Sequence, residues 1–99
     1  MLIELGGTLY VWTQTKNSSG VATAPDASAA PTYAVYEGDQ NTPLLTGTMS
    51  GPVNSETGLY KATLSVTSGN GFERGQTYLF RSEYTITSTR SDEQTFTVV

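Results

Sequence analysis

The chain has 99 residues, enough for one compact domain around one hydrophobic core, residues 1–99, and too few for two. Charged residues make up 14% of it, and nine acidic against five basic side chains give a net charge of −4. An acidic chain of this kind lacks the basic patch that nucleic-acid binding needs. The sequence has no Cys and no His, which excludes disulfides, thiolate or imidazole metal ligands, and Ser-His or Cys-His catalysis.

The sequence shows neither a membrane span nor a secretory signal. No segment approaches the ~18–20 consecutive apolar residues that cross a bilayer. The opening residues MLIELGG lack the basic region and the long apolar region of a signal peptide. We therefore expect a protein that stays where it is made or leaves by a route that needs no signal.

The first two predicted elements lie near the N-terminus. Residues 1–6 predict a short arm or edge strand. Residues Thr8–Thr15 are β-branched and aromatic, and they predict a longer strand. Its two faces are both apolar, with Tyr10 and Trp12 on one and Leu9 and Val11 on the other. Apolar groups on both faces favour a central strand or a strand that a partner covers.

The middle of the chain predicts a loop followed by two strands. Residues 16–31 are rich in Ser, Ala, Thr and Pro and have few large apolar groups, so we expect an exposed, mobile loop. Thr32–Glu37 predicts a strand. Leu44–Met49 predicts a short strand in which Gly47 marks a bulge or a close backbone approach.

The clearest strands lie in the second half. Gly58–Val66 and Tyr78–Thr87 alternate between large apolar and polar side chains, the period of half-buried antiparallel strands. Gln94–Val99 predicts a final strand, and residues 88–92 predict the loop of the hairpin before it.

These short strands, separated by turns, predict an all-β fold: a single immunoglobulin-like antiparallel β-sandwich of about seven strands. The core positions follow from the alternation along each strand. The predicted core is Leu9, Val11, Tyr33, Val35, Leu45, Tyr60, Ala62, Leu64, Val66, Phe72, Tyr78, Phe80, Tyr84, Ile86, Phe96 and Val98.

The acidic residues give no catalytic or metal site. Asp92 and Glu93 are neighbours in the sequence, and neighbouring side chains in a strand point to opposite faces, so the two carboxylates are poorly placed to share a proton. Glu37, Asp39 and Asn41 alternate and could offer oxygen ligands to Ca²⁺, but they lack the full spacing of a calcium loop. We interpret them as a solvated turn.

Nucleophilic and phosphate-binding chemistry also lacks its partners. Ser and Thr are plentiful, but the chain has no His and no recognisable Ser-x-x-Lys arrangement. Gly69 and Gly71 are followed by no Lys-Ser/Thr pair, so they predict a turn and not a phosphate loop. We therefore expect no enzymatic activity, no catalytic residue, no cofactor and no metal ion.

The aromatic residues leave two interpretations open. A lone Trp in a small sandwich is usually a core or interface residue, because it buries a large area. Tyr10 beside Trp12 could instead stack on sugar rings. The candidate interface residues are Tyr10, Trp12 and Tyr36, since protein interfaces favour aromatic side chains at their centre.

Several segments together resemble a known group of proteins. They are GTLYVWT at residues 7–13, PTYAVYE at 31–37, LLTGTM at 44–49, TGLY at 57–60, NGFERGQTY at 70–78 and the closing TFTV strand. From about Gly6 to Val99, the chain resembles the small immunoglobulin-like or macroglobulin-like sandwich proteins among the structural proteins of tailed bacteriophages. These motifs are mainly structural.

The resemblance implies a non-enzymatic component of the virion, assembled in the bacterial cytoplasm, that decorates a capsid, neck, tail or fibre in several copies. Its implied partners are other virion proteins, with which it docks through a β face or a β edge. The alternative is an adhesion module that binds a glycan on the host surface. The resemblance supplies no catalytic residues.

Overall fold

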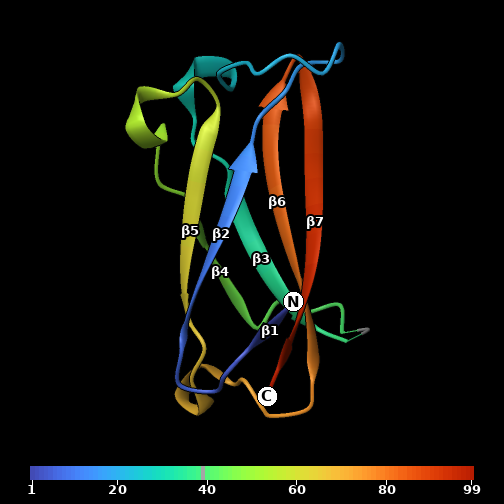
Figure 1. The fold of residues 1–99 in the computed structure, drawn as a ribbon. Coiled ribbons are helices and arrows are strands. Elements are labelled where there is room, and N and C mark those ends of the chain that lie inside the picture. Colours follow the sequence, from blue (N-terminus) through green and yellow to red (C-terminus); the bar gives the residue numbers. More distant parts are fainter. Residues whose placement is uncertain (39) are drawn as a thin grey trace.

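The computed structural model describes residues 1–38 and 40–99, and within them it is all-β, as predicted (Figure 1). Seven strands and three short 3₁₀ helices follow one another along the described chain. The strands are β1 (Leu2–Ile3), β2 (Thr8–Gln14), β3 (Thr32–Glu37), β4 (Leu45–Thr48), β5 (Leu59–Ser65), β6 (Thr77–Ile86) and β7 (Ser88–Val98); the helices are η1 (Asp26–Ser28), η2 (Val53–Ser55) and η3 (Ser68–Asn70).

The strands form two sheets that pack on each other. One has five strands in the order β1-β7-β6-β3-β4, and the other consists of β2 and β5 (Figure 1). Every strand pair is antiparallel except that of β1, which runs parallel to the end of β7 with Leu2 opposite Thr97. Buried side chains from both sheets make one hydrophobic cluster, so the predicted two-layer packing is confirmed.

Strand β2 shows the clearest alternation, and its place in the sheet decides against one of the two predicted alternatives, the central strand. Leu9, Val11 and Thr13 are buried, whereas Tyr10 and Trp12 point outward and stay about half exposed. The strand is not central, because within residues 1–38 and 40–99 it pairs with β5 alone, in a two-stranded sheet. Its second apolar face is therefore open to a partner.

Most of the predicted core is buried. The buried hydrophobic residues are Leu9, Val11, Val35, Met49, Tyr60, Ala62, Leu64, Val66, Phe72, Tyr78, Phe80, Ile86, Phe96 and Val98. Tyr33, Leu45 and Tyr84 are only partly buried, and Met49 was not predicted. Tyr33 lies near the β4 edge, where its ring stacks on Phe80 at 5.2 Å and covers Gly47. The close approach predicted at Gly47 is thus made by a side chain.

The two ends of the core differ in polarity. At one end, three aromatic rings pack together: the ring centroid of Tyr78 lies 4.8 Å from that of Phe72 and 5.6 Å from that of Phe96. Further along the sheets the interior is polar, because the Thr13 and Ser82 hydroxyl oxygens lie 3.2 Å apart in a hydrogen bond. Both hydroxyls are buried and paired, so this layer leaves no unsatisfied group at either residue.

The loop at residues 16–31 is less exposed than its composition predicts. Lys16 pairs with Ala22 in an isolated bridge, and η1 follows. Pro25 and Pro31 are buried, so the segment returns to the body of the domain twice. The prediction of an exposed loop therefore holds for only part of it.

The hairpin between β6 and β7 is tighter than predicted. Residues 88–92 belong to β7, and Ile86 pairs with Ser88 across Thr87. Thr87 takes a positive φ of 68°, and its N–H donates to the Asp26 carboxylate at 2.8 Å. The loop prediction was wrong because polar β-branched residues form strands as readily as they form turns.

Tyr78 ties the connection before β6 to the core and gives a pH-dependent prediction. The Glu73 N–H donates to the Tyr78 hydroxyl oxygen at 2.8 Å. Burial, the largest cause, raises the pKa of Tyr78; the Glu73 hydrogen bond lowers it, and the Glu37 and Glu73 carboxylates raise it further. Tyr78 therefore ionises at lower pH in the unfolded chain, so its contribution to stability is complete below about pH 10 and is lost as pH rises further.

We expect Tyr78→Phe to cost about 1–2 kcal/mol of unfolding free energy at neutral pH, because it leaves the Glu73 N–H without a partner. The variant should also lose less stability than the wild type between about pH 9 and pH 11. Urea denaturation at neutral pH, at about pH 9 and at about pH 11 measures both effects on the unfolding free energy. Tyr10→Phe is the control, since Tyr10 is exposed; equal losses in both variants would contradict the prediction.

Candidate functional site

The candidate site is the outer side of the β2–β5 sheet, called here the aromatic face. Trp12 lies opposite Lys61 in the strand register, and Tyr10 lies opposite Thr63. Trp12 is 48% exposed and Tyr10 is 53% exposed, so the two rings together form an exposed aromatic patch. The outward residues of the face are Thr8, Tyr10, Trp12, Gln14, Leu59, Lys61, Thr63 and Ser65.

Lys61 sits between the two rings. Its Nζ is 5.5 Å from the ring centroid of Tyr10 and 5.6 Å from that of Trp12. Cation–π attraction of this kind contributes about 0.5–1 kcal/mol at exposed sites. The backbone of Lys61 is held as well, because it exchanges two 2.8 Å hydrogen bonds with Ser50. The three side chains therefore form one ordered cluster on paired strands.

The charge of the aromatic face differs from that of the whole chain. Lys61 is the single charged side chain among the outward residues, so the face carries about one positive charge at neutral pH. The chain as a whole carries −4. The centre of the face is thus aromatic and weakly cationic in an otherwise acidic protein.

The edge of β2 is less suited to docking than its face. The Thr15 N–H donates to Gly58 O and the Val66 N–H to Gly7 O, so odd-numbered residues of this strand pair with β5. Even-numbered residues turn their backbone groups to the other edge. There the Gln94 side chain donates to the Trp12 carbonyl at 3.2 Å. This contact obstructs the addition of another strand beside Trp12.

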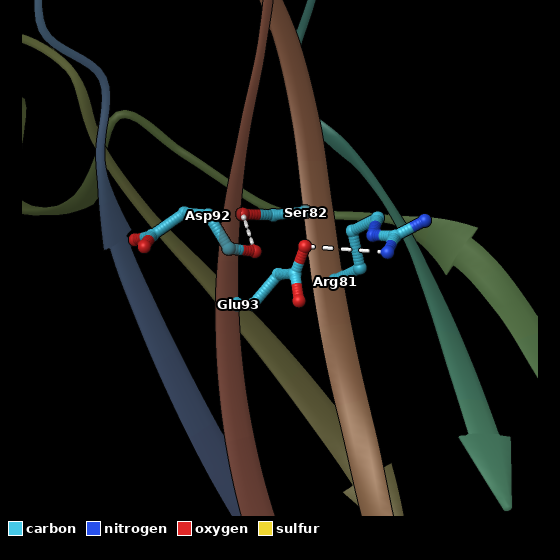
Figure 2. A network of polar contacts seen from close by, with 4 residues as sticks. All are labelled: Arg81, Ser82, Asp92 and Glu93. Carbon is cyan, nitrogen blue, oxygen red and sulfur yellow. Dashed lines mark hydrogen bonds and ion pairs between the residues drawn. The ribbon is translucent and has the colours of Figure 1, made fainter. Parts of the chain in front are cut away.

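Tyr36, the third candidate residue, lies on the opposite outer face of the molecule. It projects from the outer side of the five-stranded sheet, because its neighbour Val35 is buried in the core. The structure therefore brings Tyr10 and Trp12 together and separates Tyr36 from both. The Arg81 guanidinium carbon lies 5.6 Å from the Tyr36 ring centroid, and Arg81 also pairs with Glu93 at 3.2 Å (Figure 2).

A shallow cavity of about 410 Å³ lies beside Tyr36, called here the outer groove. It is formed where the outer sides of β3, β4 and β6 meet. The outward residues that line it are Thr32, Ala34, Tyr36, Thr46, Thr48, Arg81 and Glu83. Sequence reasoning did not find this groove, since its walls come from three strands far apart in the chain.

The acidic residues lie as the strand alternation predicts. Glu93 pairs with Arg81 on the outside of β7, whereas Asp92 points to the side of β2, away from it (Figure 2). Of the alternating turn residues, Asp39 lies outside the described residues, and Glu37 ends β3. Residues 1–38 and 40–99 contain no group of three or more acidic side chains placed to hold a metal ion.

Gly71 ends η3 with a φ of 92°, and the Thr67 hydroxyl accepts from the Asn70 N–H at 3.2 Å, so this glycine-rich segment is a capped turn.

Among the residues that the structure describes, no helix is long and apolar enough to span a membrane.

The fold and the site together define a small all-β domain of two packed sheets with an exposed aromatic face. No protein-family model matches the chain, and no curated protein or solved structure is significantly similar to it.

Proposed function

We propose that this chain is a non-enzymatic structural or decoration domain of a tailed-bacteriophage virion, which docks on a neighbouring virion protein through the aromatic face. The observation that carries the docking role is the exposed pair Tyr10 and Trp12 on a face whose single charge is Lys61. Interface centres are enriched in aromatic side chains and depleted of charged ones. The virion context, in a capsid, neck, tail or fibre, depends on the sequence resemblance.

Two observations support an immunoglobulin-like assignment of the sandwich. In that fold the second and fifth strands pair in one sheet, while the third, sixth and seventh pair in the other. The β2–β5 pair and the β3-β6-β7 order agree with this arrangement. The hydrogen bond between the Tyr78 hydroxyl and the Glu73 backbone resembles the tyrosine corner at the start of the sixth strand.

We expect Trp12→Ala to weaken docking at least about tenfold, since central interface aromatics often contribute 2 kcal/mol or more. The change should alter the unfolding free energy by less than about 1 kcal/mol, because Trp12 is half exposed and lies outside the core. The measurement is the amount of each protein retained on purified virions, quantified by mass spectrometry.

Val21→Ala is the matched control, because Val21 is an exposed apolar residue in the loop before η1. It should leave retention unchanged. Purified virions that lack this chain would overturn the virion role. Equal retention of the Trp12 and Val21 variants would overturn the role of the aromatic face.

A second candidate function is a glycan- or cell-surface-binding adhesion module. The observation that favours it is the placement of two neighbouring rings on one open face, where they could stack on successive sugar units. A glycan array tests it with the wild type and Trp12→Ala side by side. Binding that is lost in the variant supports this function, and an absent or unchanged signal contradicts it.

A further inference from the structure

We propose that the neighbour seated on the aromatic face is a second copy of this chain, which receives Trp12 and Lys61 in its outer groove. This inference rests on the proposed function, because it takes the aromatic face as the docking surface and names its occupant. The two surfaces match in shape and in charge, and they lie on opposite sides of the core.

The shapes are complementary. The aromatic face projects two large side chains that are about half exposed, Tyr10 and Trp12. The outer groove offers a cavity of about 410 Å³, which is large enough for an indole ring. Its wall includes the half-buried ring of Tyr36, and aromatic pairs contribute about 0.5–1.5 kcal/mol beyond the area they bury.

The charges are complementary too. In the groove, Arg81 is already paired with Glu93 at 3.2 Å. Glu83 lines the same groove, is exposed and makes no ion pair within 4.0 Å among the described residues. The aromatic face supplies Lys61 and no carboxylate. Contact between the two surfaces therefore places an ammonium group near an unpaired carboxylate.

The positions of the two surfaces determine the kind of assembly. The aromatic face lies on the outer side of the β2–β5 sheet, and the groove lies on the outer side of the five-stranded sheet, with the core between them. A contact between different surfaces of identical chains is head-to-tail and leaves one of each surface free. Such contacts close into a ring or continue as a stack.

Sedimentation velocity over a concentration series tests this proposal with the full chain. We expect the wild type to associate reversibly, with Trp12→Ala weakening the association at least about tenfold. Lys61→Glu and Glu83→Lys should each weaken it about fivefold, because each places two like charges at the contact. Unchanged thermal unfolding in all three variants shows that the fold is retained.

Mixing the two charge variants gives the sharpest result. The Lys61→Glu variant has a carboxylate on the aromatic face and another in the outer groove. The Glu83→Lys variant has an ammonium group at each of these two positions. A mixture should therefore associate to within about twofold of the wild type, although each variant is weakened when alone. Arg74→Glu and Glu73→Lys are controls with the same charge changes in the exposed loop before β6, and they should associate like the wild type.

Two outcomes would overturn the proposal. One is a wild type that stays monomeric up to about 1 mM, the concentration at which even weak specific contacts are populated. The other is association that the variants do not alter or that mixing does not restore. The proposed function is tested separately, because neither outcome affects whether the wild type is retained on virions or whether Trp12→Ala lowers that retention.

Discussion

Gly58→Ala is expected to lower the unfolding free energy by about 3 kcal/mol or more, because two penalties act at one position. Gly58 is buried and has a φ of +76°, where a side chain is strained. An added Cβ would lie 2.7 Å from Thr15 Oγ1, 2.8 Å from Thr15 O and 3.2 Å from Thr23 O. The same stretch of backbone carries the 2.8 Å hydrogen bond from the Thr15 N–H to Gly58 O, so it cannot move freely.

Gly75→Ala is the matched control for this prediction. Gly75 also has a positive φ, +86°, but an added Cβ would meet nothing within 4 Å. Only the backbone penalty of about 1–2 kcal/mol applies there. Urea denaturation of both variants separates strain from collision, and equal losses would show that the crowding around Gly58 has no energetic effect.

Phe72→Ala is expected to cost about 3–5 kcal/mol, the range for removing a buried aromatic ring. Phe72 lies between η3 and β6, outside any strand, yet it is only 1% exposed. Its ring centroid is 4.8 Å from that of Tyr78 and 6.0 Å from that of Phe96. The substitution removes the ring that joins this connection to the aromatic end of the core.

Thermal and urea unfolding measure the loss for Phe72→Ala, and Tyr10→Ala serves as the control. Tyr10 is an aromatic residue on the surface, so its removal should cost less than about 1 kcal/mol. A loss below about 1 kcal/mol for Phe72→Ala would mean that the connection does not help to stabilise the core.

The strands could be predicted because their burial has a period of two. β5 and β6 each have one buried face, and this alternation made their positions predictable. Their bounds differ from the predicted segments by only one residue at each end. The position of β2 in its sheet could not be predicted, because it depends on the long-range pairing of Thr8 with Ser65. Alternation determines which side a residue faces, but not which strand lies beside it.

The same limit applies to the candidate site. Tyr10 and Trp12 could be assigned to one face from their spacing of two residues. Lys61 could not be assigned to them, since it joins the pair only through the register that places it opposite Trp12. The distance between Trp12 and Tyr36 along the sequence does not determine which sheet each residue joins. Their positions on opposite sides of the core could therefore not be predicted.

The position of the single tryptophan has a practical consequence. Trp12 lies on the outer side of β2 and not among the buried side chains, so its fluorescence reports on the surface around it. Any molecule that covers this residue should shift its emission to shorter wavelength. Unfolding of the core should change the Trp12 emission far less than such binding does. Unfolding is therefore better followed by circular dichroism.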